Sequence, residues 1–256
     1  MILFVFEGKE REPRLFDTIQ RLFFPKENTT IVCSFGNNIY ELYRELSALD
    51  GAGDLVSLLQ KRYEDTLDNP FRDVGNASDF SEIYLFFDYD FHNGNLSLEQ
   101  MNGQLAEMLS LFDDETENGK LYINYPMIES IRYTKRLPDA VFYQYSVSRE
   151  QCRDFKKLAA DFSDYANLDF ILLDDRKAPT EKKLESLKSN WEYLKAQNVC
   201  KANYLCHDCN ILPEHKCDVS QDRIFEAQLK KYVATDSCKV AILNAFPLFL
   251  YEYFKS

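Results

Sequence analysis

The sequence predicts an α/β protein, with a doubly wound and mostly parallel sheet over residues 1–148 and a mainly helical region over residues 149–256. In the first region, four short apolar runs alternate with segments of helical periodicity, a pattern that favours parallel strands connected by helices. In the second region helical periodicity predominates. A chain of 256 residues is long enough to bury one large core, or a core with a smaller appendage.

The predicted sheet begins with the apolar run Ile2–Phe6, which ends abruptly at Glu7 and Gly8. Pro13–Phe24 follows as an amphipathic helix, because its apolar residues recur every three or four positions. Thr29–Ser34 is short and rich in β-branched residues, which predicts a second strand.

A helix then begins after Asn37 or Asn38, either of which can cap it, and its apolar stripe extends to Leu49. Residues 50–80 are rich in glycine and acidic residues, and we interpret them as an insertion. Within this insertion, Leu55–Tyr63 has the periodicity of one short helix.

The third predicted strand is Glu82–Asp90, which is apolar until its acidic end. A capped helix follows over Ser97–Phe112, and Lys120–Asn124 forms the fourth strand. Tyr125-Pro126 then begins a further helix, with Glu129 in its first turn.

The second half is predicted to be helical near residues 149–165, 180–198, 220–233 and 240–254. Two features interrupt the helices. Phe170–Leu173 has the pattern of a strand, and residues 200–217 form a cysteine-rich loop.

Composition narrows the class of protein. An apolar fraction of 45% and an aromatic fraction of 14% exclude a disordered chain. No apolar run is long enough for a membrane span, so we expect a cytoplasmic protein without a membrane partner.

The formal charge of −12 is carried entirely by the first 150 residues. Because such a surface repels nucleic acid, a nucleic-acid enzyme of this composition needs divalent metal, a local basic groove or a basic partner.

Three acidic residues lie at the carboxyl ends of predicted strands. Glu7 ends the first strand, next to the permissive Gly8, and Asp88 and Asp90 end the third, two residues apart on the same face. If those strands are neighbours, the three carboxylates converge at one edge of the sheet. Such a group needs a cation, and hard oxygen ligands favour Mg²⁺ or Mn²⁺, which points to phosphoryl transfer.

These motifs resemble the Toprim domain of topoisomerases, primases and OLD-type nucleases. The resemblance is closer to the small RloB-like Toprim proteins of bacterial anti-phage systems, and it covers about residues 1–135. The matching residues, in order, are Glu7-Gly8, Glu12-Pro13, Phe16, Asp88-Tyr89-Asp90, Pro126 and Glu129.

The resemblance implies that Glu7 is a catalytic acid/base or a metal ligand and that Asp88 and Asp90 bind metal. It makes Glu12 and Glu129 possible ligands of a second ion. It also implies a metal-dependent nuclease acting on DNA or RNA, including tRNA, as an anti-phage effector. Such an effector would work as a homo-oligomer or with a protein partner, for example an ATPase of the same system. The alternative is a non-catalytic Toprim-like subunit that regulates a defence complex, which an acidic surface suits better.

Simpler roles remain open for all these residues. The strand-end acids can lie in solvent or cap nearby helices, and Glu12 and Glu129 fall in first helical turns, where acids are favoured regardless of function. Lys9, Arg132 and Lys135 are candidates for substrate binding, although Arg132 can equally pair with Glu129 on a helix surface.

The cysteine-rich loop contains a possible structural zinc site. Its candidate ligands are Cys206, Cys209, His215 and Cys217. Reduced, partly buried thiols are the alternative, since the spacing of His215 and Cys217 is tight for two ligands of one ion, and Cys200 and His207 are rival candidates.

Overall fold

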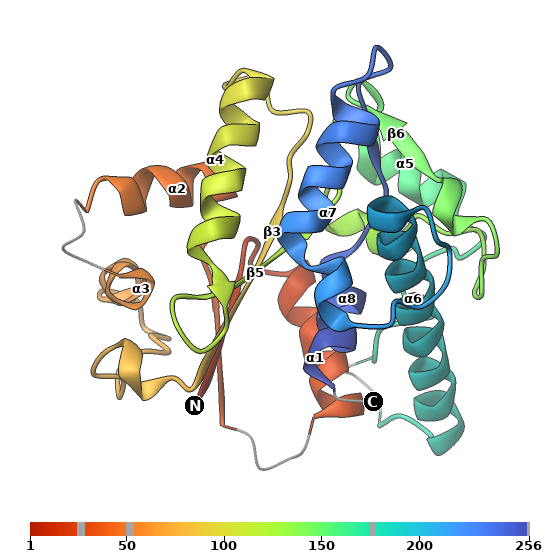
Figure 1. Ribbon diagram of the computed structural model, residues 1–256. Helices are drawn as coiled ribbons and strands as arrows, with labels where there is room; N and C mark the ends of the chain where they lie inside the picture. Colours follow the sequence, from red (N-terminus) through yellow and green to blue (C-terminus); the bar gives the residue numbers. More distant parts are fainter. Residues whose placement is uncertain (25–28, 50–53, 175–177, 255–256) are drawn as a thin grey trace.

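The computed structural model describes residues 1–24, 29–49, 54–174 and 178–254, and its centre is a five-stranded sheet (Figure 1). In their order across the sheet, the strands are β2 (Thr30–Ser34), β1 (Ile2–Phe6), β3 (Glu82–Asp88), β5 (Gly119–Asn124) and β4 (Asp113–Asp114). The first four are parallel, and the short β4 is antiparallel to β5. The predicted α/β class with a mostly parallel sheet is therefore confirmed.

Helices form much of the remaining described chain. The α-helices are α1 (Arg11–Phe23), α2 (Ile39–Ser47), α3 (Leu55–Tyr63), α4 (Leu98–Leu111), α5 (Phe155–Phe162), α6 (Glu181–His207), α7 (Gln221–Gln228) and α8 (Ala245–Tyr253). Shorter 3₁₀ or π segments are η1 (Ala77–Asp79), η2 (Ile128–Arg132), η3 (Phe142–Gln144), η4 (Gln151–Asp154), η5 (Lys216–Val219) and η6 (Leu229–Val233). β6 (Ser146–Ser148) and β7 (Lys239–Ala241) pair as a separate two-stranded antiparallel sheet. None of the described helices is both long enough and apolar enough to cross a membrane.

The strand register aligns the carboxyl ends of the central strands. Phe6 of β1 lies opposite Phe86 of β3, and Asp88 of β3 lies opposite Asn124 of β5. Because these strands run in the same direction, the residues that follow them meet at one edge of the sheet. All five residues of β1 are buried, as expected for a central parallel strand covered on both faces.

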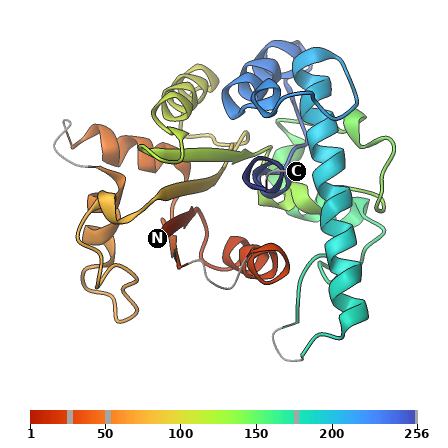
Figure 2. The same cartoon turned by 60° about the horizontal axis from the view of Figure 1, so that its bottom comes forward.

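Helices cover both faces of the sheet. On one face, α1 packs against β1, and the ring centroids of Phe4 and Phe16 are 4.0 Å apart. On the opposite face, α2 and α4 contact each other, and Figure 2 shows α1 and α4 on opposite sides of the strands. At the β2 edge, the Tyr63 hydroxyl of α3 bonds to the Ser34 backbone N–H and carbonyl at 2.9 and 2.7 Å, which partly covers the exposed strand.

The two predicted regions share one hydrophobic core. α8, from the second region, lies on the same face of the sheet as α1, and its Phe249 ring is 5.7 Å from Phe4. Phe249 also contacts Tyr84 at 5.0 Å and Tyr122 at 5.7 Å, edge-on in both cases. Residues on both sides of the predicted boundary at residue 148 therefore belong to one packed cluster of aromatic and aliphatic side chains.

Several predicted elements differ from the structure. Phe170–Leu173 is a turn and not a strand, because its polar backbone groups bond to side chains: Thr18 Oγ1 accepts from Leu173 N at 3.1 Å, and Trp191 Nε1 donates to the Ile171 carbonyl at 3.0 Å. The segment after Pro126 forms the 3₁₀ helix η2 instead of an α-helix.

The other corrections concern boundaries. α6 continues to His207, so the predicted cysteine-rich loop begins only at Asp208. The helix predicted over residues 240–254 begins at Ala245, because Asn244 Oδ1 accepts a hydrogen bond from Phe246 N and caps it, and β7 precedes it. The insertion over residues 50–80 contains α3 and η1, and its residues 50–53 lie outside the described part.

We predict that Phe249→Ala lowers the free energy of unfolding by about 3–5 kcal/mol, because it leaves a cavity between α8 and the sheet. Urea unfolding followed by the fluorescence of Trp191, the single and fully buried tryptophan, measures the change. Leu67→Ala is the control, because this side chain is 89% exposed and its loss should change stability by less than about 0.5 kcal/mol. Equal effects of the two substitutions would contradict the packing of α8 on the sheet.

Candidate metal centre

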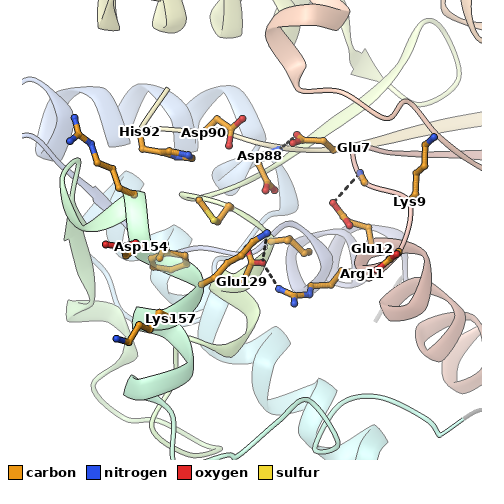
Figure 3. Close-up of a pocket in the computed structure, with 17 residues that line it drawn as sticks. Glu7, Lys9, Arg11, Glu12, Asp88, Asp90, His92, Glu129, Asp154 and Lys157 are labelled. Atoms are coloured by element: carbon orange, nitrogen blue, oxygen red, sulfur yellow. Dashed lines mark hydrogen bonds and ion pairs between the residues drawn. The ribbon is translucent and has the colours of Figure 1, made fainter. Parts of the chain in front are cut away.

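The carboxylates of Glu7, Asp88 and Asp90 form a cluster at the carboxyl edge of the sheet (Figure 3). Each offers one oxygen, and these oxygens all lie within 4.8 Å of one another. Asp88 N donates a hydrogen bond of 2.9 Å to Glu7 Oε2, so the two strand ends are directly connected. The predicted convergence of these three side chains is confirmed.

Backbone hydrogen bonds fix the position of Glu7. Its N–H donates to the Phe86 carbonyl at 3.0 Å, and its carbonyl accepts from Gly36 N at 2.9 Å. Glu7 thus extends the pairing of β1 with both neighbours by one residue. A Cβ at Gly8 would lie 2.8 Å from the Glu12 carboxylate, so a larger residue here would displace that side chain.

Asp90 reaches the cluster by a different route from the one we predicted. β3 ends at Asp88, and Asp90 lies beyond it with a left-handed backbone, φ 50°, which aspartate tolerates better than most residues. Its N–H donates to the Pro126 carbonyl at 3.1 Å, which holds this turn against the chain that follows β5. A turn therefore brings Asp88 and Asp90 together. They do not lie on the same face of one extended strand, as we predicted.

Asn124 supports Asp88 and was missing from our predicted site. Its Nδ2 donates to Asp88 Oδ1 at 2.9 Å, and its Oδ1 accepts from Ala245 N at the start of α8, also at 2.9 Å. Asn124 is fully buried. It is the final residue of the fourth predicted strand, so the argument from strand ends that identified Glu7 and Asp88 also applies to it.

Glu12 and Glu129 both lie beside the cluster and are buried. Glu12 Oε1 accepts a hydrogen bond of 3.2 Å from Gly8 N. Glu129 is only 6% exposed, and its Oε1 pairs with Arg11 and lies 3.7 Å from Lys156 Nζ. The other oxygen of Glu129, Oε2, is buried and has no hydrogen-bond partner among the described residues.

Burial and mutual repulsion raise the pKa values of these acids. Burial raises the pKa of Glu7 well above its usual value, and the charge of Asp90 raises it further, whereas the hydrogen bond from Asp88 N opposes the rise. Burial is also the main cause for Asp88, followed by the charges of Glu7 and Asp90. For Asp90, burial raises the pKa and the nearby His92 lowers it. Burial likewise raises the pKa of Glu12.

The residues present fit a divalent cation. Carboxylate oxygens are hard ligands of the kind that Mg²⁺ and Mn²⁺ prefer, and a cation relieves the repulsion that raises the pKa values. Glu7, Asp88 and Asp90 would hold such an ion. Among the described residues that line the same cleft, Glu129 Oε2 and His92 Nδ1 are buried and have no hydrogen-bond partner.

The cluster lies in a cleft of about 850 Å³ whose other side is basic. Of the predicted substrate-binding residues, Lys9 lines this cleft. Sequence reasoning missed Arg153, Lys156 and Lys157 of η4 and α5, which also line it; Figure 3 shows Lys157. The available signal was three basic residues within five positions of a predicted helix. The sequence around that helix did not indicate that it lies beside the carboxylates.

The other two predicted substrate-binding residues lie elsewhere. Arg132 donates hydrogen bonds to the carbonyls of Tyr165 and Ala166 at 2.7 and 2.8 Å. Lys135 donates to the Phe162 carbonyl at 2.7 Å, and its ammonium group lies 4.2 Å from the centre of the Phe162 ring. Neither residue lines the cleft around the cluster, and both hold the region after α5 against the segment around η2.

The predicted zinc ligands are not gathered in the structure. Cys206 lies in the last turn of α6, and Cys209, His215 and Cys217 follow it. Over residues 1–24, 29–49, 54–174 and 178–254, Glu7, Asp88 and Asp90 make up the one group of three or more candidate ligands within binding distance of each other. Burial raises the pKa of Cys206 to about 11, which favours a protonated thiol.

Comparison with known proteins identifies no relative of this chain. No protein-family model, curated protein or solved structure matches it. What the carboxylate cluster does is therefore inferred from the residues and contacts described above.

We predict that Asp88→Asn stabilises the metal-free protein near pH 7 and that its advantage over the wild type shrinks as the pH falls. An acid with a raised pKa binds its proton more tightly in the folded protein than in the unfolded chain. The metal-free wild type therefore loses stability as the pH rises from about 4, the ordinary carboxyl pKa, towards the raised value. Urea unfolding at a series of pH values in EDTA measures this, with the exposed Asp65→Asn as control. A variant as stable as the wild type at every pH would contradict the raised pKa.

We also predict that Mn²⁺ or Mg²⁺ stabilises the wild type and releases protons on binding, because the raised pKa values make the metal-free carboxyl groups bind protons more tightly than usual. At a free metal concentration of about 100 times Kd, the gain is roughly 2.7 kcal/mol. Thermal unfolding measures the gain, and calorimetry in two buffers of different ionisation enthalpy measures the protons. Asp88→Asn should reduce both effects strongly and Asp65→Asn neither. The absence of both effects in the wild type would count against a cation site.

Proposed function

We propose that this chain is a Toprim-like, Mg²⁺- or Mn²⁺-dependent nuclease that hydrolyses phosphodiester bonds of nucleic acid. The observation that carries the proposal is the cluster of Glu7, Asp88 and Asp90 in a cleft with basic residues on its other side. Carboxylates alone would repel a phosphodiester. A cation held between them, together with lysine and arginine side chains nearby, removes that obstacle.

When bound, the divalent ion would polarise the phosphodiester and make an attacking water more acidic. The protein supplies the positions of the acids and the control of protons. Asn124 and the Asp88 N–H hold Asp88 and Glu7 in place. Glu7 belongs to the cluster, and its carboxylate can accept a proton from the attacking water. The oxygen–phosphorus bond to the leaving strand then breaks as the new bond forms.

Glu12 and Glu129 are candidates for a second cation site beside the first. Both are buried next to the cluster, and Glu129 Oε2 has no hydrogen-bond partner among the described residues. However, Oε1 of Glu129 already pairs with Arg11. A second ion at Glu129 would therefore share this carboxylate with a cationic side chain.

The arrangement of β1 and β3 as parallel neighbours supports the Toprim resemblance. Glu7 follows β1 and Asp88 ends the neighbouring parallel strand β3, as the convergence of the motif requires. The anti-phage role depends on the Glu12-Pro13 and Pro126/Glu129 motifs alone, and it belongs to the same proposal.

We predict that the wild type cleaves a DNA or RNA substrate in Mn²⁺ or Mg²⁺, and that Glu7→Gln and Asp88→Asn each lower the rate at least about 100-fold. Each substitution keeps the side chain's size but removes a negative charge from the cluster. Gel analysis of labelled single-stranded and duplex DNA and RNA measures cleavage. Glu185→Gln, an exposed residue of α6, is the matched control and should cleave at the wild-type rate.

Two outcomes would contradict the nuclease proposal. One is cleavage that survives both cluster substitutions, which would indicate a contaminant. The other is metal binding without cleavage of any of the four substrates, alone or with the protein partner, which would favour the non-catalytic alternative.

A further inference from the structure

A second pocket of about 400 Å³ adjoins the cleft that contains the carboxylate cluster. The two share Glu10, Arg11, Glu129 and Lys156, so these residues lie where the cleft opens into the second pocket. The second pocket extends from there between the start of α1 and the segment that follows α5. Any group that passes from the cluster into the second pocket must cross this junction.

The junction is preorganised around a buried acid. Glu129 pairs with Arg11, from the first turn of α1, and lies near Lys156, from α5. The Glu129 carboxylate therefore keeps the Arg11 and Lys156 side chains near the junction before any ligand binds. Arg11 still has further N–H donors, and the Lys156 side chain is 76% exposed, so both can contact a passing anion.

The second pocket itself is basic beyond the junction. Arg14, Arg132 and Asp169 line it there. Arg14 is exposed and, within the described chain, makes no ion pair with any acid. Arg132 is held by carbonyl groups, but its Nε is buried and has no hydrogen-bond partner among the described residues. The pocket therefore offers cationic donors that the protein's own acids do not satisfy.

We propose that the cleft and the second pocket together bind one unpaired strand of nucleic acid. The scissile phosphate lies at the carboxylate cluster, and the next phosphate lies in the second pocket, near Arg14 and the Arg11–Glu129–Lys156 junction. The inference rests on the proposed nuclease function and specifies its substrate class. The pocket's arginine and lysine side chains attract the phosphates of any strand, so we expect binding to tolerate any sequence.

The depth of the site is what selects an unpaired strand. Asp88 lines the cleft and is only 7% exposed, so its carboxylate lies below the protein surface. A single strand is flexible enough to send one phosphate to that depth and the next across the junction. Duplex DNA is stiff over about 150 base pairs and carries its phosphates on a broad cylinder. It would have to bend sharply or open to place two neighbouring phosphates in the two pockets.

Binding of short fluorescent oligonucleotides, measured by anisotropy in Ca²⁺ with gels to confirm that they stay intact, tests the inference. The probes are oligothymidylate, oligouridylate and a blunt DNA duplex of the same length. We expect either single strand to bind on the order of tenfold more tightly than the duplex. Arg14→Gln and Lys156→Gln should each weaken single-strand binding roughly fivefold and reduce its salt dependence. Arg136→Gln, an exposed arginine outside both pockets, is the control and should bind like the wild type.

A second comparison isolates the proposed subsite. A thymidine dinucleotide with a 5′-phosphate should compete better than one without it, and Arg14→Gln should remove that advantage while Arg136→Gln keeps it. Equal or tighter duplex binding, or Arg14→Gln and Lys156→Gln proteins that bind like the control, would overturn the inference. Because binding is measured without cleavage, these results stay separate from the nuclease test. Cleavage without a single-strand preference would reject only the inference, whereas single-strand binding without cleavage in Mn²⁺ would reject only the nuclease.

Discussion

The crowding of three carboxylates at the ends of two neighbouring strands is the constraint on which the rest of this structure depends. Glu7, Asp88 and Asp90 are held close together and largely away from water, which is unfavourable for charged groups. Folding must therefore supply a scaffold stable enough to impose this arrangement. The scaffold consists of paired backbone at β1 and β3, the side chain of Asn124, and a core of stacked aromatic rings below the cluster.

That core is assembled from distant parts of the chain. Rings from β1, β3 and β5 meet rings from α8, with Phe249 in contact with all three strands. Asn124 joins the same helix to the cluster, because one end of its amide bonds to Asp88 and the other to Ala245 N. The packing of α8 and the position of a candidate metal ligand are thus coupled through one buried side chain, so damage to either should affect the other.

The parts of the structure that follow from local sequence could be predicted, and the parts set by distant contacts could not. Ile2–Phe6 and the strand-end acids have local signals, namely an apolar run and an abrupt change to charge. The turn at Phe170–Leu173 looks like a strand because its apolar pattern does not reveal that Trp191 and Thr18 satisfy its backbone. Lys156 was missed for a similar reason, since its neighbour Glu129 lies in a different region of the sequence. The predicted zinc ligands share a short segment, but α6 runs through Cys206 and separates it from the others.

Because α8 comes after the strands of the sheet in the sequence, it is also synthesised after them. N-terminal segments emerge from the ribosome first, so the strands that carry Glu7 and Asp88 can pair long before residues 245–253 exist. During that interval one face of the sheet lacks the helix that covers Phe4 and Tyr84, and Asn124 lacks its partner at Ala245. The growing polypeptide therefore passes through a stage in which the acidic edge is present but incompletely supported. A ribosome-bound chain that stops short of α8 should expose the aromatic rings on this face of the sheet and bind chaperones.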